Sequence, residues 1–138
     1  MTDQWTIRPI DPAKDLSFVF ATWTQGSHGS CACTRAIYKP TYYTHQNKRC
    51  QQIMHDLNTR VLIACLPDDK DVILGYIVYQ LDPHWIHWVH VKAPFQGNGI
   101  ARSLWAASEL PEGCWTSAWH HSVSDLIKRL KLMYSPYV

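Results

Sequence analysis

A glycine-rich turn is the part of the sequence whose residue types and spacing best suit chemistry. Gln96-Gly97-Asn98-Gly99-Ile100-Ala101 lies between an apolar stretch typical of a strand and a stretch typical of a helix. Glycines leave backbone N–H groups uncovered, and the helix N-terminus adds a dipole that favours a phosphate. The turn therefore predicts a pyrophosphate site. The alternative is a tight turn in which glycine serves only the backbone conformation.

Two common nucleotide-binding motifs do not explain this turn. Arg102 stands where the dinucleotide fingerprint would have its third glycine, and a Walker loop would need Gly-Lys followed by Ser or Thr. A pair of glycines is a weak signal by itself. The interpretation therefore depends on the residues and elements around the pair.

Those surroundings resemble the GNAT superfamily of acyl-CoA N-acyltransferases, whose signature is Gln/Arg-x-x-Gly-x-Gly/Ala after a strand that ends in Val. The segment from Gln96 to Ala101 fits this signature, and Val91 precedes it. The element order also agrees over most of the chain, with Ile7-Arg8-Pro9 at the start and Leu74 to Val78 on the third strand. Agreement between a local motif and the order of elements is stronger than the motif alone.

The resemblance implies an enzyme, its acyl donor and the residues that bind the donor. We expect acetyl-CoA and no metal, with direct attack by the amine of a small molecule or a protein in a ternary complex. The segments Val89-His90-Val91-Lys92 and Ile100-Ala101 also look like small GNAT-like proteins encoded in bacteriophage genomes. The residues expected to bind coenzyme A, through its pyrophosphate and pantetheine, are Val89, Val91, Gln96, Gly97, Asn98, Gly99, Ile100, Ala101 and Arg102.

Histidines of the fourth strand are the first candidates for the catalytic base, because some GNAT amine acetyltransferases carry one there. An imidazole exchanges protons near neutral pH. Strict alternation along the strand places His87 on the same face as Val89 and Val91, and His90 on the other. His87 is the first choice, and a half-buried histidine satisfied by backbone is the equal alternative. His90 is second, if a bulge turns it inward.

The chain departs from the family pattern where a tyrosine of the last helix usually serves as general acid. Ile127 stands at that position. Tyr134, Tyr137, Ser122 or water would then supply the proton, or the protein does not catalyse ordinary acetylation. Tyr134 is carried forward as a catalytic candidate, although packing is the commoner role for such a tyrosine.

The segment 27–44 is rich in Ser, Gly, Cys, Thr and Tyr without clean periodicity and predicts a long functional loop. The resemblance to the GNAT superfamily implies that this loop shapes the acceptor site. Cys31 and Cys33, with His28, suggest zinc, but this spacing differs from the usual knuckle and a fourth ligand is not evident. We expect unbound thiols. Five cysteines, an odd number, also fit poorly with a disulfide framework.

The remaining periodicities predict one α/β (α+β) domain, 1–138. The resemblance implies the GNAT fold, a central mixed, mostly antiparallel twisted sheet of about six strands flanked by about four helices. Asp11-Pro12 is typical of a helix start, as N-cap and first helical residue. The predicted strands are 5–10, 60–66, 72–81, 85–91 and 114–116, with an extended tail at 133–138; the predicted helices begin at Asp11-Pro12 and end near Gly26, then follow at 45–57, 100–110 and 122–132.

Composition and charge limit the classes of partner that the chain is expected to bind. The chain of 138 residues is 46% hydrophobic and 17% charged, as in globular domains. A net charge of +2 leaves nucleic acid open as a partner but does not favour it. No stretch reaches the ~20 apolar residues of a membrane span. We expect a cytoplasmic protein, in the host cytoplasm if phage-encoded, and leave a homodimer open.

Two other functions share this fold and stay open at this point. One is a phage-type GNAT-fold enzyme that modifies a nucleobase, for which abundant aromatic residues would permit stacking. The other is a GNAT-fold binding module that has lost chemistry, which the absence of the usual tyrosine favours. Fold alone does not decide between them.

Overall fold

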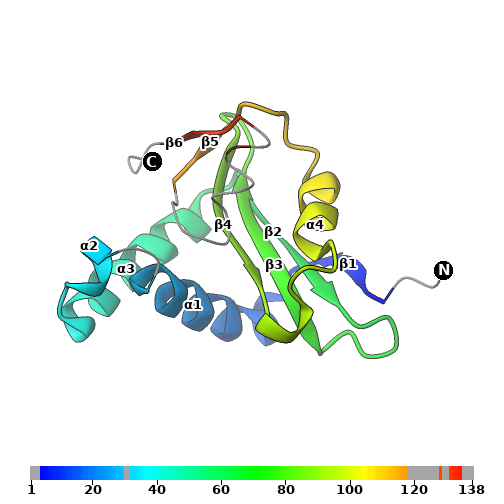
Figure 1. The fold of residues 1–138 in the computed structure, drawn as a ribbon, viewed down its shortest axis with the longest axis horizontal. Coiled ribbons are helices and arrows are strands. Elements are labelled where there is room, and N and C mark those ends of the chain that lie inside the picture. The colour runs from blue at the N-terminus through cyan, green and yellow to red at the C-terminus, as the bar shows by residue number, and fades with distance from the viewer. Residues whose placement is uncertain (1–3, 30–31, 118–127, 129–130, 135–138) are drawn as a thin grey trace.

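The computed structural model describes residues 4–29, 32–117, 128 and 131–134 (Figure 1). A six-stranded sheet in the order β1-β2-β3-β4-β5-β6 forms the centre. Neighbours are antiparallel from β1 to β4, whereas β5 runs parallel to β4 and β6 parallel to β5. This confirms the mixed, mostly antiparallel sheet. The strands are β1 Thr6–Pro9, β2 Thr59–Cys65, β3 Ile73–Gln80, β4 Trp85–Val91, β5 Trp115–Thr116 and β6 Met133–Tyr134.

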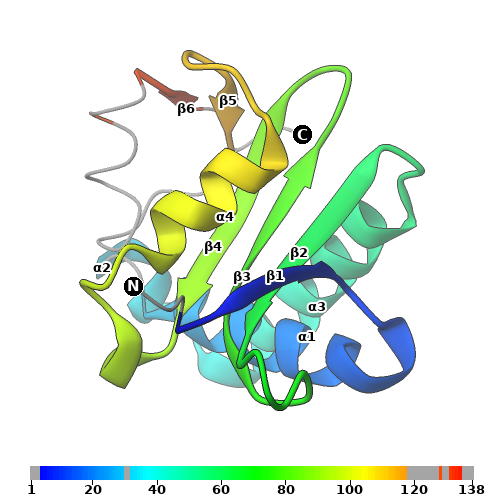
Figure 2. The same cartoon turned by 90° about the vertical axis from the view of Figure 1, so that its right-hand side faces the viewer.

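Helices cover both faces of the sheet. The described helices are α1 Pro12–His28, α2 Ala32–Arg35, α3 Lys39–His55 and α4 Ile100–Ser108, and a 3-10 turn spans Ala93–Phe95. Helices α1 and α3 lie on one face and α4 crosses the other, as the two views of Figures 1 and 2 show. Among the described residues, no helix is long and apolar enough to cross a membrane.

Each face has its own apolar core. On the α4 face, Ile100 and Leu104 pack with Ile77, Ile86 and Val89 of the sheet. On the α1/α3 face, the cluster includes Val19, Trp23, Cys50, Ile53, Tyr76 and Trp88. Because β3 contributes to both clusters, all of its residues are buried. The central strands are therefore fixed from both sides.

The start of α1 confirms the expected cap. The Asp11 carboxylate accepts a hydrogen bond from Ala13 N at 3.1 Å, and Pro12 occupies the first helical turn. Arg8 of β1 donates to both carboxylate oxygens of the buried Asp15, at 2.6 and 3.0 Å. This pairing lowers the pKa of Asp15 and joins the helix to the sheet.

The prediction of a long loop at 27–44 is wrong. Helix α1 continues to His28, and α3 begins at Lys39 instead of 45. Tyr42 donates a hydrogen bond from its hydroxyl to Ser27 Oγ at 2.8 Å, so the end of α1 and the start of α3 are packed together. Periodicity failed here because only Cys50 and Ile53 of α3 are buried, which leaves almost no apolar stripe to detect.

A bulge in β4 corrects the alternation assumed from the sequence. Val78 pairs with Trp88 and Tyr79 with Ile86, so His87 is an extra residue between two pairs. Trp88 consequently packs in the α1/α3 core and Val89 in the α4 core. The prediction that His87 and Val89 share a face is therefore wrong. The predicted helix 122–132 lies almost wholly outside the described residues; Lys128 is helical.

The close approach of β3 and β4 gives a stability prediction. A Cβ at Gly75 would lie 2.5 Å from the His90 carbonyl oxygen. Gly75→Ala should therefore lower the free energy of unfolding by about 1–3 kcal/mol, measured by urea denaturation. Gly29→Ala is the matched control, because its backbone has φ −83 and its Cβ would meet nothing closer than 3.9 Å. Equal effects of the two substitutions would contradict this account.

Candidate active site

The glycine-rich turn follows the end of β4 and leads into α4. Gly97 and Gly99 have φ of 82° and 92°, a left-handed backbone that favours glycine. A Cβ at either position would meet nothing within 4 Å. These glycines are therefore required by the backbone conformation, and the space in front of the turn is open to a ligand.

The N-terminus of α4 supplies backbone N–H groups at this turn. The first helical bond is donated by Ser103 N to Gly99 O, at 3.0 Å. The amides of Ile100, Ala101 and Arg102 precede that bond, so they have no acceptor within the helix. Arg102 is exposed at the same end. Amides, helix dipole and a guanidinium together fit a pyrophosphate.

The side chains of Gln96 and Asn98 brace the turn. Gln96 donates from Nε2 to Val91 O at 3.0 Å, and Asn98 donates from Nδ2 to Phe95 O at 3.2 Å. Both amides are thereby used inside the loop. In this conformation Gln96 and Asn98 position the glycines and do not present their side chains to a ligand.

Within the described residues, strand β4 has an open edge beside this turn. It pairs with β5 only at Trp85 and Ile86, and the last bond between them is donated by Ser117 N to Ile86 O at 3.0 Å. Beyond that bond, the described residues place no strand on this edge of β4. The described pairing of the two parallel strands therefore ends before β4 reaches the glycine-rich turn.

Val89 and Val91 face this open edge with their backbone. Lys92 N donates to Leu74 O at 2.9 Å, and bonding in an antiparallel pair alternates, so Val89 and Val91 direct their amides away from β3. Val89 is 4% exposed and packs in the α4 core. Its side chain cannot line a ligand, whereas its N–H and C=O can form hydrogen bonds with an extended one.

His87 is held at the bulge with both ring nitrogens engaged. Nδ1 lies 2.7 Å from Ser117 Oγ, and Nε2 lies 3.2 Å from Gln80 Oε1. The ring also stacks on Trp85, with centroids 6.2 Å apart and planes 8° from parallel. At 1% exposure His87 is buried rather than half-buried, and side chains rather than backbone satisfy it.

Burial lowers the pKa of His87 to about 4, because desolvation disfavours the charged ring. Arg49 lowers this pKa further and Asp56 raises it, both by their charges. The imidazole is therefore neutral at neutral pH. Of its two hydrogen-bond partners, Gln80 is buried and Ser117 is half-buried.

His90 lies on the α1/α3 face, three residues beyond the bulge. Its ring contacts Tyr76 and Phe18, with centroids 5.4 and 6.0 Å apart. Burial lowers its pKa, and the charge of Lys92 lowers it further. His87 and His90 are thus both neutral histidines, and the structure does not bring their rings together.

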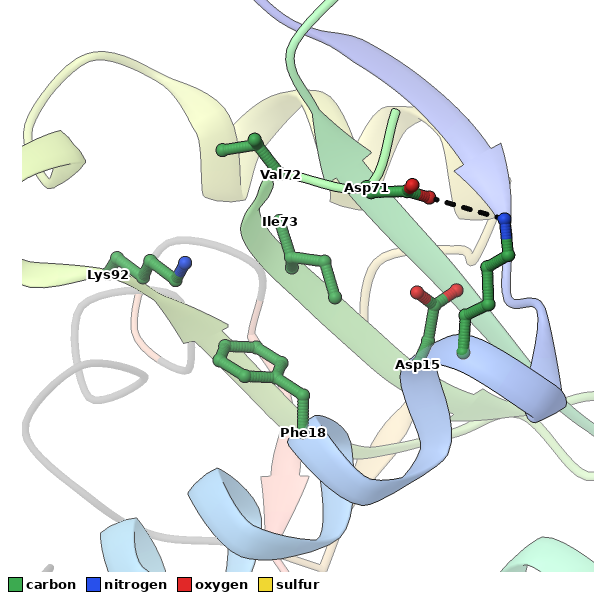
Figure 3. A pocket seen from close by; sticks show the side chains of 7 residues that line it. Asp15, Phe18, Asp71, Val72, Ile73 and Lys92 are labelled. Atoms are coloured by element: carbon green, nitrogen blue, oxygen red, sulfur yellow. Dashed lines mark ion pairs between the residues drawn. The ribbon is translucent and has the colours of Figure 1, made fainter. Parts of the chain in front are cut away.

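A cavity of about 580 Å³ opens on the same face at the far end of β4 (Figure 3). Lys92 extends over the Phe18 ring, 5.1 Å from its centroid, and Lys14 pairs with Asp71 at 3.7 Å. Asp15, which also lines the cavity, is already bound by Arg8. Lys92 lies five residues from His87, roughly 16 Å along a strand, so this cavity is separate from the bulge.

The sequence matches the acetyltransferase (GNAT) family over residues 30–125, which is more than half of the chain. The chain belongs to the GNAT family. GNAT acetyltransferases use acetyl-CoA as the acetyl donor. The open edge of β4 and the glycine-rich turn are the parts of the described structure that fit this donor.

Solved structures share the fold at low identity. A Pyrococcus furiosus protein assigned as an acetyl transferase is 12% identical, with 97% of this chain and 83% of that chain covered and a TM-score of 0.64. The Bacillus subtilis protein YycN, also assigned as an acetyltransferase, is 11% identical, with 95% of this chain and 80% of that chain covered and a TM-score of 0.60. The chain spans 62% of a GNAT-family protein from Desulfovibrio desulfuricans. At these identities only the fold is shown.

No curated protein shows significant similarity to the chain. Neither the family match nor the structural comparisons support the narrower likeness to phage-encoded GNAT proteins.

Several candidates for the GNAT general acid lie outside the described residues. These are Ser122 and Tyr137; Ile127, which the resemblance places at the usual tyrosine position, also lies outside them. Tyr134 ends β6, and the structure does not describe its side chain. Sequence reasoning missed Ser117 and Gln80, which contact His87 across two neighbouring strands. Neither had a local signal, because both contacts are formed only by the sheet.

The cysteines of this GNAT chain that the structure describes are buried thiols. Cys50, Cys65 and Cys114 are free, and burial raises the pKa of Cys50 to about 12 and that of Cys114 to about 11. Among the described residues, no cluster of three or more His, Cys, Asp or Glu could hold a metal. Cys31 and the side chain of Cys33 lie outside what is described, so the zinc hypothesis is not tested by them.

The glycine-rich turn gives a binding prediction. Gly99→Glu places a side chain and a negative charge in front of the amides, and it should abolish saturable binding of acetyl-CoA in isothermal titration. Gly113→Glu is the matched control, because Gly113 has φ 79 and a Cβ there would meet nothing closer than 3.9 Å. It carries the same strain and charge away from the turn and should bind normally. Loss of binding in both would refute the assignment.

The buried imidazole gives a pH prediction. In NMR titration, His87 should protonate with a midpoint near the pKa of about 4. In the unfolded chain in urea the same histidine should titrate near ~6.5. Because the unfolded state then binds more protons between these values, the free energy of unfolding should fall as pH drops through this window. A native midpoint near 6 would show that His87 is not desolvated.

Proposed function

We propose that this protein is an acetyl-CoA-dependent N-acetyltransferase that transfers acetyl to an amine by direct attack in a ternary complex. The observation that carries the proposal is the glycine-rich turn at the open edge of β4, within a chain of the GNAT family. Turn and edge are continuous, so one extended thioester could reach from the first to the second.

Different groups of the chain would hold different parts of the donor. Amides of Gly97, Gly99, Ile100 and Ala101 would bind the pyrophosphate, with Arg102 nearby, and the pantetheine would bond to the free backbone edge. The bound donor supplies an activated acetyl group. Gln96 and Asn98 hold the turn in the binding conformation without contacting the ligand in this state.

The described groups that could take part in the proton chemistry of the proposed reaction include two histidines of β4. An attacking amine is neutral and must lose a proton after attack. The neutral imidazoles of His87 and His90 can each accept one, and burial holds both in that form at neutral pH. Of the two, His87 lies beside Ser117, where the described pairing of β5 with β4 ends, whereas His90 lies against α1.

The acceptor assay tests the proposed function. The wild type, given acetyl-CoA and a panel of primary amines, nucleobases and unpaired DNA, should release coenzyme A thiol and yield an acetylated amine detected by mass spectrometry. Gly99→Glu should be inactive and Gly113→Glu active.

Three outcomes separate the alternatives. Acetylation of a nucleobase with salt-sensitive DNA binding would support the base-modifying reading instead. Binding of acetyl-CoA without transfer to any amine would support a binding module. Absence of acetyl-CoA binding would refute the proposal as a whole.

A further inference from the structure

Ser117, His87 and Gln80 form a continuous chain of hydrogen bonds through three strands. Ser117 Oγ lies 2.7 Å from His87 Nδ1, and His87 Nε2 lies 3.2 Å from Gln80 Oε1. Gln80 ends β3, His87 is the bulge residue of β4, and Ser117 directly follows β5. The chain therefore connects the end of β3 and the bulge of β4 to the residue that follows β5.

The partners determine where the protons lie. Gln80 Oε1 can only accept a hydrogen bond, so Nε2 of His87 carries the ring proton and donates it. Nδ1 of the neutral ring then has a lone pair, and the Ser117 hydroxyl donates to it. This polarises the hydroxyl and makes its oxygen a better acceptor for a further proton.

The position of Ser117 differs from that of the two residues behind it. His87 is 1% and Gln80 8% exposed, whereas Ser117 is half-buried. Among the described residues, Ser117 N makes the last bond between β5 and β4, so Ser117 lies where the open edge of β4 begins. Of the three residues, Ser117 is the one that a ligand on this edge can touch.

We propose that Ser117 is a catalytic residue of this protein, which passes the proton of the attacking amine to His87 and returns it to the departing thiolate. This inference rests on the proposed acetyltransferase function. His87 and Gln80 are positioning residues, because they act through Ser117. The relay would replace the last-helix tyrosine, whose usual position Ile127 occupies.

The step balances without any additional reactant. The amine nitrogen bonds to the thioester carbonyl carbon, and the carbon–sulfur bond breaks with its electron pair going to sulfur. The proton lost by nitrogen moves to Ser117 Oγ while the serine proton moves to His87 Nδ1. The proton then returns through Ser117 to sulfur, which leaves amide, free thiol and the original chain.

The chain is arranged to carry a proton for a short time. Protonated His87 would donate from Nδ1 to Ser117 Oγ and from Nε2 to Gln80 Oε1, so neither donor loses its acceptor. Burial makes that charged form unfavourable, so the ring readily gives up the proton. Stacking on Trp85 keeps the ring in place through both states.

Hydroxyl removal is the first test. Ser117→Ala should lower kcat for amine acetylation about 100-fold or more, the range of a lost proton-transfer group, with unchanged affinity for acetyl-CoA in isothermal titration. Ser117→Thr restores a hydroxyl and should recover most of the loss. Ser17→Ala, on the exposed side of α1, is the control and should match the wild type. Wild-type kcat in Ser117→Ala would overturn the relay.

A pH profile is the second test, because a merely structural serine would not change it. Gln80→Glu puts a carboxylate against Nε2–H and should raise the pKa of His87, which Arg49 and Asp56 also influence. The acidic limb of kcat, where His87 becomes protonated, should shift to higher pH by about one unit or more. An unshifted limb in a variant that still binds acetyl-CoA would overturn the role of His87.

The readouts keep this inference distinct from the proposed function. An inactive wild type refutes the proposed function, whereas an active wild type with a fully active Ser117→Ala refutes the relay alone. Intact-mass measurement with acetyl-CoA and no amine should show unmodified protein. An acetylated Ser117 would overturn direct attack, because it would make the serine a nucleophile.

Discussion

Among the described residues, strand β4 is hydrogen-bonded to β3 along one edge and to β5 only at its first two residues, and the candidate site depends on this asymmetry. In a closed sheet every such amide would have a neighbouring strand as partner. No described strand pairs with β4 at Val89 and Val91, and this edge leads into the glycine-rich turn. The bulge at His87 lies where the edge opens, so a polar chain and a ligand edge begin at the same point.

Packing on both faces keeps this half-open strand rigid. The α4 core holds Ile86 and Val89, and the α1/α3 core holds Trp88. Helix α1 comes so close that a Cβ at Gly26 would lie 2.8 Å from the Trp88 ring. The polar groups next to the open edge are mainly amides, a hydroxyl and a neutral imidazole. In such surroundings hydrogen bonds are stronger than in water, and a fixed geometry favours catalysis.

Sequence reasoning was accurate where a signal is local and failed where it is not. Apolar runs located the three central strands within one or two residues, and Asp11-Pro12 located the start of α1. Segment 27–44 looked irregular because the helices there bury few residues and are stabilised by contacts such as that of Tyr42 with Ser27. Alternation along β4 failed at His87, because a bulge is set by the pairing of two strands and leaves no mark in one of them.

The sequence by itself determined the fold class, the glycine-rich turn and the histidines of β4, because alternation, turn chemistry and glycine spacing act over a few residues. The tertiary structure decided that His87 is buried and that Ser117 and Gln80 are its hydrogen-bond partners. It also decided that Gln96 and Asn98 brace the glycine-rich turn. The two hydrogen bonds of His87 join residues that are 7 and 30 positions apart in the chain. Only the pairing of strands brings such residues within hydrogen-bond distance, because the local sequence around each residue does not indicate its partner.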